Sequence, residues 1–285
     1  MKEVIFIKKL LNPKNDYVFK RIFGYTGNED ITKSLLSSII PDNIEEITLD
    51  CNPITEKDLF DDKVGILDIK AKLNNSTNCN IEMQIVDRKN LEKRLLFYWS
   101  KMYTSSIKSG EDYDKLKRSI VILISDYNLE KLLNEPEYMS KWNIRREKSP
   151  HLVLTDMLEI YIIEAEKAKN YVLENNEVLN SWLQFINDPE VVLKMENNEL
   201  KKAKRILEEI SEDEHERRLT ELREKYIRDQ HDIEARGYDK GLEAGIKQYQ
   251  IEIIKKMKSE NFDISTISRI TGLDENQINK ILSNN

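Results

Sequence analysis

Two acidic side chains in the stretch GILDIKAKLNNSTNCNIEMQIV, residues 65–86, have the types and the spacing that metal-dependent chemistry requires. Read in steps of two, its polar residues are Asp68, Lys70 and Lys72 before the NNSTN segment and Asn80, Glu82 and Gln84 after it. This alternation predicts the two strands of a hairpin whose polar side chains share one face. Carboxylates on neighbouring strands repel each other unless one is protonated or a cation lies between them. A hard divalent ion, Mg²⁺ or Mn²⁺, would satisfy them together with water and a substrate phosphate.

The register of this hairpin decides which side chains face each other. A loop over residues 74–78 predicts Asp68 opposite Gln84 and Lys70 opposite Glu82, whereas a register shifted by two residues keeps the same faces. The other face is apolar and is expected to join the core: Ile69, Ala71, Leu73, Ile81, Met83 and Ile85. A metal on the polar face would polarise a phosphoryl oxygen and lower the pKa of a bound water, which predicts phosphodiester hydrolysis. The alternation by itself, however, is more typical of an ordinary antiparallel hairpin with one solvated face.

The composition is that of a folded, heavily charged chain. Of its 285 residues, 39% are hydrophobic and 34% are charged, and no apolar run approaches the length of a signal-peptide core or of a membrane span. We therefore expect a cytoplasmic protein with no membrane partner. Its two cysteines, Cys51 and Cys79, and its three scattered histidines form no zinc-binding motif.

The net charge of −7 disfavours nucleic acid as a partner, but the charges are unevenly distributed. Residues 128–246 hold 27 acidic and 19 basic side chains, whereas residues 88–118 hold nine Lys or Arg against four acids. A basic surface is therefore available directly after the hairpin.

Hydrophobic periodicity predicts an α/β core in which helices flank a central mixed sheet. Helices are expected over residues 12–24, 29–40, 89–109 and 178–186, the first with Asn12 as its N-cap and Pro13 in its first turn. Strands are expected over residues 44–50, 118–125 and 157–165, in addition to the two strands of the hairpin. The continuous apolar run RSIVILIS, residues 118–125, suits a strand that is covered on both faces.

From about residue 196 the sequence changes to charged helical segments with narrow apolar stripes, typical of solvated helices that pair through a seam. Gly237, Gly241 and Gly245 recur every four residues, which would permit close helix contact, although a flexible charged linker is the alternative. We expect a core over residues 1–195, a helical connector over 196–250 and a tail over 251–285. A homodimer through the C-terminal helices is the expected assembly.

The tail resembles a helix-turn-helix unit. Ser268 is the small residue of its first helix, Gly272 makes the turn, and Ile278 anchors its second helix. Small helical tails with this pattern often only dimerise, so contact with DNA and dimerisation alone both stay open.

The succession NPKNDYVFKRIFG, LDIKAK, NIEMQI and RLLFYWSKMYTSSIKSGEDYDKLKRSIVILI resembles the PD-(D/E)XK nuclease superfamily, and within it the Rpn-type family of recombination-promoting nucleases and transposases. The later segments TDMLEIYIIEAEK and NSWLQFI, the glycine-spaced helix and the helical tail also look like that family, so the resemblance covers nearly the whole chain. It implies a restriction-endonuclease-like core and a Mg²⁺-dependent (or Mn²⁺-dependent) DNA endonuclease linked to recombination or mobile elements.

The resemblance also implies roles for individual residues. Asp68 matches the aspartate of the second core strand, and Glu82 and Gln84 match the E-x-K or E-x-Q element of the third. In this superfamily both carboxylates and the main-chain carbonyl of the residue between the last two, here Met83, bind the metal. Gln84 departs from the usual lysine, and a neutral amide can only orient water by hydrogen bonds. Lys70, on the same face, is a candidate for the missing cation, with a solvated or salt-bridged strand lysine as the alternative.

A polar stripe follows on the next predicted helix: Arg94, Tyr98, Lys101, Ser105 and Lys108. Arg94 and Tyr98 match polar positions that follow the catalytic strand in the family, where they would contact the scissile phosphate or the flanking backbone. A solvated helix face explains the stripe equally well. Asp16, in the first helix, is a further candidate to approach the site.

These observations lead to three hypotheses. The first is a dimeric metal-dependent DNA endonuclease with little sequence specificity in its core. The second is a nuclease-like fold that cleaves weakly or not at all and binds DNA or a partner, which Gln84 and the acidic segment 128–246 favour. The third is a transposase that joins strands, although the site chemistry itself supports only hydrolysis.

Overall fold

The computed structural model describes residues 9–50, 54–60, 68–87, 90–190 and 197–283. The chain forms two compact units, Met1–Glu224 and Lys225–Asn285. Within the described ranges, no helix combines the length and the apolar character that crossing a bilayer requires.

The first unit is built on a mixed six-stranded sheet with the strand order β1-β2-β3-β4-β8-β5. The strands are β1 (Ile47–Asp50), β2 (Ile69–Leu73), β3 (Thr77–Gln84), β4 (Arg118–Ser125), β5 (Met139–Trp142) and β8 (Leu158–Glu164). Strands β1, β2 and β3 are antiparallel neighbours, β3, β4 and β8 run parallel, and β5 runs antiparallel to β8. The parallel step from β3 to β4 requires a crossover, which helix α3 (Leu91–Thr104) supplies. The predicted α/β class with a central mixed sheet is confirmed.

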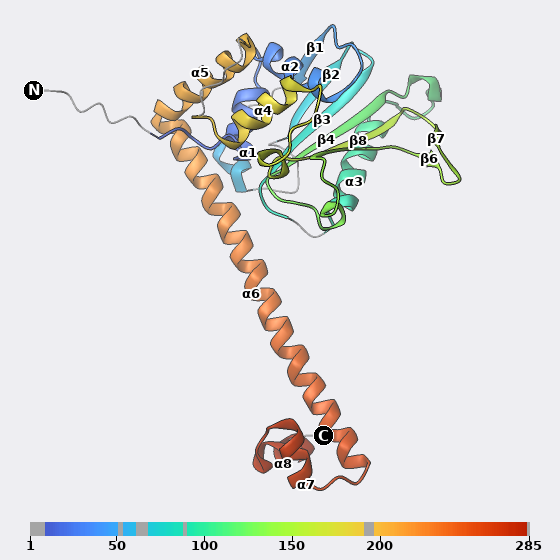
Figure 1. Ribbon diagram of the computed structural model, residues 1–285, viewed down its shortest axis with the longest axis vertical. Coiled ribbons are helices and arrows are strands. Elements are labelled where there is room, and N and C mark those ends of the chain that lie inside the picture. The colour runs from blue at the N-terminus through green and yellow to red at the C-terminus, as the bar shows by residue number, and fades with distance from the viewer. Residues whose placement is uncertain (1–8, 51–53, 61–67, 88–89, 191–196, 284–285) are drawn as a thin grey trace, which may run out of the picture. The chain divides into compact units, whose positions relative to one another are not determined.

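Helices cover both faces of this sheet, as Figure 1 shows. One face carries α1 (Asp16–Phe23), α2 (Glu29–Ile39), α4 (Glu177–Asn187) and α5 (Asn198–Glu212), and α3 lies on the other. Strand β4 is buried between the two layers: Ile120, Ile122 and Ile124 contact the first, whereas Val121 and Leu123 join the apolar cluster of α3. This double burial accounts for the continuous apolar run of β4.

Helix α1 begins later than predicted. Its N-cap is Asn15, whose side-chain oxygen accepts hydrogen bonds from the backbone N–H groups of Tyr17 and Val18. Asn12 instead accepts from the backbone N–H of Lys14, in a turn that precedes the helix. The predicted cap at Asn12 is therefore wrong, because its side chain is used in that earlier turn.

Helix α3 ends at Thr104, before the predicted end at residue 109. The hydroxyl of Ser105 donates to Met102 O at 2.8 Å, and that of Ser106 donates to Tyr103 O at 2.6 Å. Such local bonds offer the backbone carbonyls an alternative to continued helix.

Some elements of this unit have no counterpart among the predicted ones. They are the edge strand β5, the separate hairpin of β6 (Arg145–Arg146) and β7 (Ser149–Val153), and the short 3₁₀ helices η1 (Glu56–Phe60), η2 (Tyr113–Lys115), η3 (Glu130–Leu132) and η4 (Lys167–Lys169). The β6–β7 hairpin is almost entirely exposed, so its sequence carries no buried face from which a strand could be predicted.

Helix α5 packs on the core of the first unit, although it lies in the range predicted as a connector. Its buried residues Leu200, Ala203 and Leu207 belong to the same apolar cluster as α1 and α2. The start of α6 (Glu214–Ser259) is also attached to α1, because Tyr17 Oη donates to Glu216 Oε2 at 2.7 Å.

The second unit comprises the remainder of α6 with α7 (Ile264–Thr271) and α8 (Glu275–Ser283). Ile254, Ile267 and Ile278 are fully buried and form its small core. Gly272 ends α7 in the left-handed conformation, at a φ of 73°, and makes the turn to α8. Ser268 fastens this turn by donating its hydroxyl to Leu273 O at 2.7 Å.

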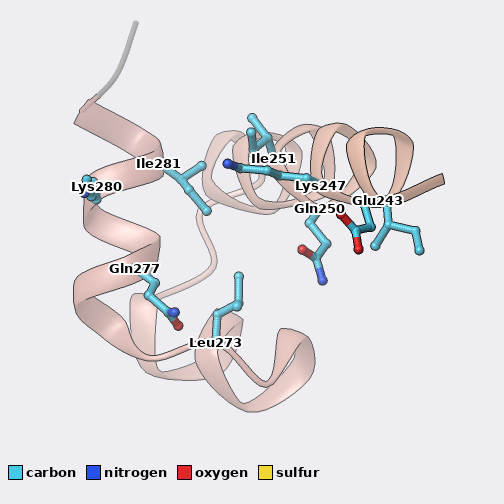
Figure 2. A pocket seen from close by; sticks show the side chains of 9 residues that line it. Glu243, Lys247, Gln250, Ile251, Leu273, Gln277, Lys280 and Ile281 are labelled. Atoms are coloured by element: carbon cyan, nitrogen blue, oxygen red, sulfur yellow. The ribbon is translucent and has the colours of Figure 1, made fainter. Parts of the chain in front are cut away.

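A groove of about 600 Å³ lies within this second unit, between α6 on one side and α8 with the turn before it on the other (Figure 2). Its lining mixes apolar and charged side chains: Glu243, Ile246, Lys247, Gln250, Ile251, Leu273, Gln277, Lys280 and Ile281. It lacks the paired carboxylates that the predicted chemistry requires, which lie in the first unit.

Candidate functional site

A tight turn sets the geometry of the β2–β3 hairpin. Asn74 and Asn75 both adopt the left-handed conformation, with φ of 48° and 56°, and Ser76 N–H donates to Leu73 O at 3.1 Å. Asparagine tolerates this conformation better than most residues. The loop therefore closes within residues 74–76, not over the predicted residues 74–78.

The observed register is shifted by two residues from the predicted one. Ile69 faces Ile81 at the end of the ladder, and continuing the same antiparallel register by one residue would put Asp68, which lies just outside β2, opposite Glu82. The predicted pairing of Asp68 with Gln84 is wrong, because the shorter loop moves every partner by two. Facing positions place β-carbons about 4.5 to 5.5 Å apart, so this continuation would bring the two carboxylates closer together than the predicted register.

Lys70 has different neighbours from those predicted. It faces Asn80 on β3 and Asp50 on β1, so its predicted position opposite Glu82 is wrong for the same reason. Its side chain is exposed on a strand whose pattern alternates between buried and exposed residues. Its charge still acts on Asp68, because it opposes the rise in the pKa of that carboxyl group more than any other cation does.

Asp68 is a half-buried residue directly before β2. Its Oδ2 atom accepts a hydrogen bond from Asn80 Nδ2 at 3.3 Å. Burial raises the pKa of Asp68 above its ordinary value, and this rise is opposed by the Asn80 hydrogen bond and by the positive charges of Lys70, Arg94 and Lys20. A carboxylate in such a place favours any further cation that reaches it.

Glu82 is a buried carboxylate, 7% exposed, in the middle of the sheet. Its Oε1 atom forms an ion pair with Arg94 Nη2 at 2.9 Å. The same Nη2 lies 3.4 Å from Tyr98 Oη, and the Arg94 guanidinium lies over the Tyr98 ring at 5.7 Å. Helix α3 thus aims a cation and an aromatic ring at the carboxylate of β3.

The ion pair keeps Arg94 charged although it is partly buried. Burial lowers the pKa of Arg94. The charge of Glu82, the hydroxyl of Tyr98 and the charge of Asp68 raise this pKa by more than burial lowers it, so the net shift is upward. Burial likewise raises the pKa of Tyr98, against the lowering effect of Arg94. Both side chains therefore keep their protons throughout the neutral range.

Gln84 ends β3 and is also buried, with 6% of its surface exposed. Its Nε2 atom donates to Val86 O at 2.8 Å, whereas Oε1 has no hydrogen-bond partner among the described residues. The side chain therefore holds a buried acceptor oxygen that makes no hydrogen bond among the described residues. Met83, between Glu82 and Gln84, packs its side chain in the apolar core, as its alternation predicts.

The rest of the predicted stripe on α3 separates into different places. Lys101 is an exposed helical residue, and no ion pair engages it within the described part of the chain. Ser105 is the C-cap, and Lys108 lies beyond the helix. Only Arg94, Tyr98 and Lys101 therefore lie on the helix itself.

Asp16 is bound to another residue. Its two carboxylate oxygens accept from Arg223 at distances of 2.6 to 3.1 Å, and Arg223 also donates to Leu59 O. These bonds hold Asp16 to Arg223 and do not support the expectation that Asp16 approaches the carboxylate pair. A different residue of α1 was not predicted for the site: Lys20 is 3% exposed, and its charge acts on Asp68.

The donor set fits a hard divalent cation that is completed by water and substrate. Asp68 and Glu82 supply carboxylate oxygens, and the free Oε1 of Gln84 offers an acceptor beside them. Within the described ranges, no cluster of three or more His, Cys, Asp or Glu side chains forms a closed metal cage. Two carboxylates with open positions are typical of sites where phosphate and water complete the coordination.

One of the comparisons with known proteins supports this reading of the fold. No curated protein and no solved structure matches the chain at a significant level. The family model of the PD-(D/E)XK nuclease family transposases matches residues 13–235, a range that holds the whole sheet, the carboxylate pair and α3. The protein is therefore a member of the PD-(D/E)XK nuclease family transposases.

Proposed function

We propose that the protein is a divalent-metal-dependent endonuclease. It would hydrolyse the phosphodiester bonds of DNA at a site formed by Asp68 and Glu82. The observation that supports this proposal is the β2–β3 register, in which Ile69 faces Ile81; continued by one residue, it would set Asp68 opposite Glu82 on one polar face. Membership in a family of nucleases and transposases supports DNA as the substrate. The excess of Lys and Arg over residues 88–118 supports contact with a phosphate backbone.

In this proposal Asp68, Glu82 and the main-chain carbonyl of Met83 hold Mg²⁺ or Mn²⁺. When bound, such an ion polarises a phosphoryl oxygen and makes a bound water more acidic. Asn80 fixes the orientation of Asp68 through its hydrogen bond, much as outer partners orient metal ligands elsewhere. The Oε1 atom of Gln84 accepts a hydrogen bond from the attacking water. This bond orients the water so that a lone pair of the water oxygen points toward phosphorus.

Helix α3 supplies the contacts with the DNA backbone. Arg94 contacts Glu82 and Tyr98 contacts Arg94, so these are the residues that would meet the scissile phosphate. Lys101, exposed one helical turn further, would contact a neighbouring phosphate.

A nuclease-like fold that binds DNA without cleaving it is the second candidate. The ion pair between Arg94 and Glu82 favours it, because a guanidinium on Glu82 competes with a metal ion for the same oxygen. Gln84 also favours it, since an amide supplies no positive charge to a developing phosphorane.

Plasmid cleavage with purified protein tests the first candidate. We expect Mg²⁺ or Mn²⁺ to be required and both Asp68→Asn and Glu82→Gln to reduce the rate by about 10³-fold or more, since each removes a metal ligand. Glu92→Gln is the matched control, because Glu92 is an exposed α3 carboxylate paired only with Lys131 in the described contacts. Undiminished cleavage by either site variant would refute the assignment.

Calorimetric titration with Mn²⁺ separates the two candidates. A functional site binds Mn²⁺ and loses it with Glu82→Gln. A DNA-binding module with no metal site binds DNA equally with and without Mn²⁺, and shows no Mn²⁺ heat.

We also propose that a second copy of this chain is a partner, through the second unit. Every residue from 231 to 249 of α6 is exposed, and this range holds large apolar side chains: Ile233, Tyr238, Leu242, Ile246 and Tyr249. A single helix with three glycines and no covered face is marginal in water. Pairing with another copy would bury these side chains.

The charges of this segment favour antiparallel pairing. Residues 229–239 hold four acids and one Arg, whereas residues 247–258 hold four Lys and one Glu. Antiparallel copies would place the acidic half of one helix beside the basic half of the other.

A further inference from the structure

Helix α3 presents a second stripe of side chains beside the one that faces Glu82. Lys93, Phe97 and Lys101 recur every four residues, and all three are exposed. Residues four apart lie on the same side of a helix, one turn after another. Phe97 is 58% exposed, and its neighbour Leu96 is 49% exposed. The stripe therefore presents an aromatic ring to solvent between two ammonium groups.

A chain of contacts joins this stripe to the proposed site. The Arg94 guanidinium, paired with Glu82 at 2.9 Å, lies 5.7 Å from the centre of the Tyr98 ring. The Tyr98 ring lies 5.9 Å from the Phe97 ring, and the two planes are inclined by 60°. Phe97 is thus the next ring beyond Tyr98. A DNA strand whose phosphate contacts Arg94 would have a neighbouring nucleotide within reach of Phe97.

The order of groups along the stripe matches that of an unstacked nucleotide. Successive members lie about 6 Å apart along the helix axis, because each residue of a helix adds about 1.5 Å. A nucleotide within a strand has a flat base with a phosphate on each side, and the stripe offers a ring with a cation on each side. Proteins that bind single strands combine aromatic rings, on which bases stack, with a basic path for the backbone. The bases of an intact duplex stack on one another, so a duplex offers Phe97 no free base face.

The charges around Phe97 favour a phosphate backbone over a protein surface. Glu92 is the one acidic residue in the sequence of α3, and Lys131 pairs with it at 2.5 Å. Lys93 donates to Asn90 Oδ1 at 3.0 Å, a neutral partner that leaves its positive charge in place. The centre of a surface that binds protein is usually depleted of lysine. The lysines that flank Phe97 therefore indicate an anionic occupant.

We propose that Phe97 stacks on an unpaired base of the DNA substrate while Lys93 and Lys101 bind the phosphates on either side of that base. The substrate class is then DNA that is single-stranded, or locally unpaired, beside the scissile phosphate. This inference rests on the proposed function and narrows its substrate. Phe97 holds the strand by stacking and takes no part in the cleavage of the bond.

Binding in EDTA tests the inference without cleavage and without the metal. The full chain is titrated into three labelled probes, and fluorescence anisotropy is measured: a single strand, its duplex, and a strand of equal length that lacks its bases. The variants are Phe97→Ala, which removes the ring, and Phe97→Trp, which keeps a ring. Circular dichroism establishes that each variant is folded.

Tyr113→Ala is the matched control. Tyr113 is an aromatic residue of the same unit and is 84% exposed, but it stands between Asp112 and Asp114 in the chain. These acids repel phosphate, so we expect no base to stack there. Lys101→Gln tests the charge of the stripe separately from its ring.

The unmodified protein should bind the single strand at least about tenfold more tightly than the duplex. Phe97→Ala should weaken binding to the single strand by about tenfold, because one stacked base is lost. The same variant should change binding to the duplex and to the baseless strand by less than about threefold, since neither offers a base to stack. Phe97→Trp and Tyr113→Ala should stay within about threefold of the unmodified protein on every probe.

Lys101→Gln should weaken binding to all three probes, because all of them carry phosphates. On the single strand, the slope of log affinity against log salt concentration should decrease in magnitude by about 0.7, the effect of one lost phosphate contact.

An equal loss of affinity for the normal and the baseless strand in Phe97→Ala would mean that no base stacks on Phe97, and the inference would be wrong. A duplex that binds as tightly as the single strand would be equally decisive against it. Light scattering is measured as well. A Phe97→Ala protein of lower mass that binds every probe normally would assign this face to a second copy of the chain and overturn the inference.

Failure of the proposed function looks different, because cleavage is measured separately with Mn²⁺. A protein that cleaves plasmid, and whose Phe97→Ala variant binds and cleaves every probe equally well, loses only the role of Phe97. A protein that cleaves no DNA but binds the single strand through Phe97 is no nuclease, and its stacking site stands.

Discussion

Arg94 Nη2 lies 2.9 Å from Glu82 Oε1, so α3 places a guanidinium on the carboxylate that β3 buries at the centre of the sheet. The ion pair compensates a carboxylate that is only 7% exposed. It also sets up a competition, because a divalent cation would need the same face of the sheet. Under the proposed function, Arg94 would pair with Glu82 without the ion and would turn toward a phosphate when the ion is present.

Removing Arg94 should reveal this competition in the stability of the protein. We expect Arg94→Met to lower the free energy of unfolding by about 1–3 kcal/mol, a range reduced from that of fully buried pairs because Arg94 is partly exposed. Added Mn²⁺ should recover more stability in the variant than in the unmodified protein, since the ion replaces the lost cation. Thermal unfolding with and without Mn²⁺ measures both effects.

The control for this prediction is Lys131→Met, which breaks the exposed pair between Lys131 and Glu92. It should change stability by less than about 0.5 kcal/mol and leave the Mn²⁺ effect unchanged. Equal Mn²⁺ stabilisation of the Arg94 variant and the unmodified protein would contradict the competition.

Asn80 should act on the reaction through Asp68. Asn80→Ala removes the amide that donates to Asp68 Oδ2 at 3.3 Å, and we expect Mn²⁺ affinity to fall by about tenfold, as for other partners of metal ligands. Asn78→Ala is the control, because Asn78 lies two residues nearer the turn and faces Lys72. Calorimetry should detect the difference, and equal affinities of the two variants would show that Asn80 does not orient the carboxylate.

The faces of the hairpin could be predicted from sequence because each strand has one apolar side, although the polar side of β3 is buried as well. Ile69 and Ala71 on β2 and Ile81 and Met83 on β3 alternate with polar residues and are buried as predicted. Strand β4 could be predicted for a related reason, since a strand covered on both faces is apolar throughout. In each of these strands, the pattern of apolar residues within the strand itself indicates which face is in the core.

The register could not be predicted because it depends on the turn. Nothing in the sequence NNSTN excludes a loop of five residues, and the shorter loop depends on two consecutive asparagines in the left-handed conformation. A two-residue difference then changed which side chain faces Asp68. The faces survived this error because a shift of two preserves the alternation.

Lys20 was missed although a signal existed. Tyr17, Lys20 and Phe23 recur every three residues and lie on the buried side of α1, so a lysine occurs within an apolar stripe. A charged residue at such a position indicates a buried group with a partner. Its neighbour Ile69 is about fifty positions away in the sequence, a separation that no local pattern reveals.

The reactivity of Cys79 should report on the faces of β3. Cys79 lies on the apolar face, is 1% exposed, and burial raises the pKa of its thiol to about 12. At pH 8 only about 10⁻⁴ of this thiol would be the reactive thiolate. In a Cys51→Ser background we therefore expect alkylation only after unfolding in urea. Rapid alkylation of the native protein would mean that β3 presents its other face to the core, and the carboxylate site would then be wrong.

The exposed side chains of α6 predict how the second unit assembles. Leu242 is 50% exposed and Ile246 is 53% exposed, so a second copy that packs against them gains burial that the single chain lacks. We expect the unmodified protein to be a dimer by light scattering and Leu242→Glu with Ile246→Glu to shift it to a monomer, because two buried carboxylates would oppose pairing. Glu243→Gln serves as the control on the same helix and should stay dimeric. Since both substitutions lie outside the unit that carries Asp68 and Glu82, Mn²⁺ binding should persist in the monomer. A monomeric unmodified protein would refute the proposed partner and leave the carboxylate site untouched.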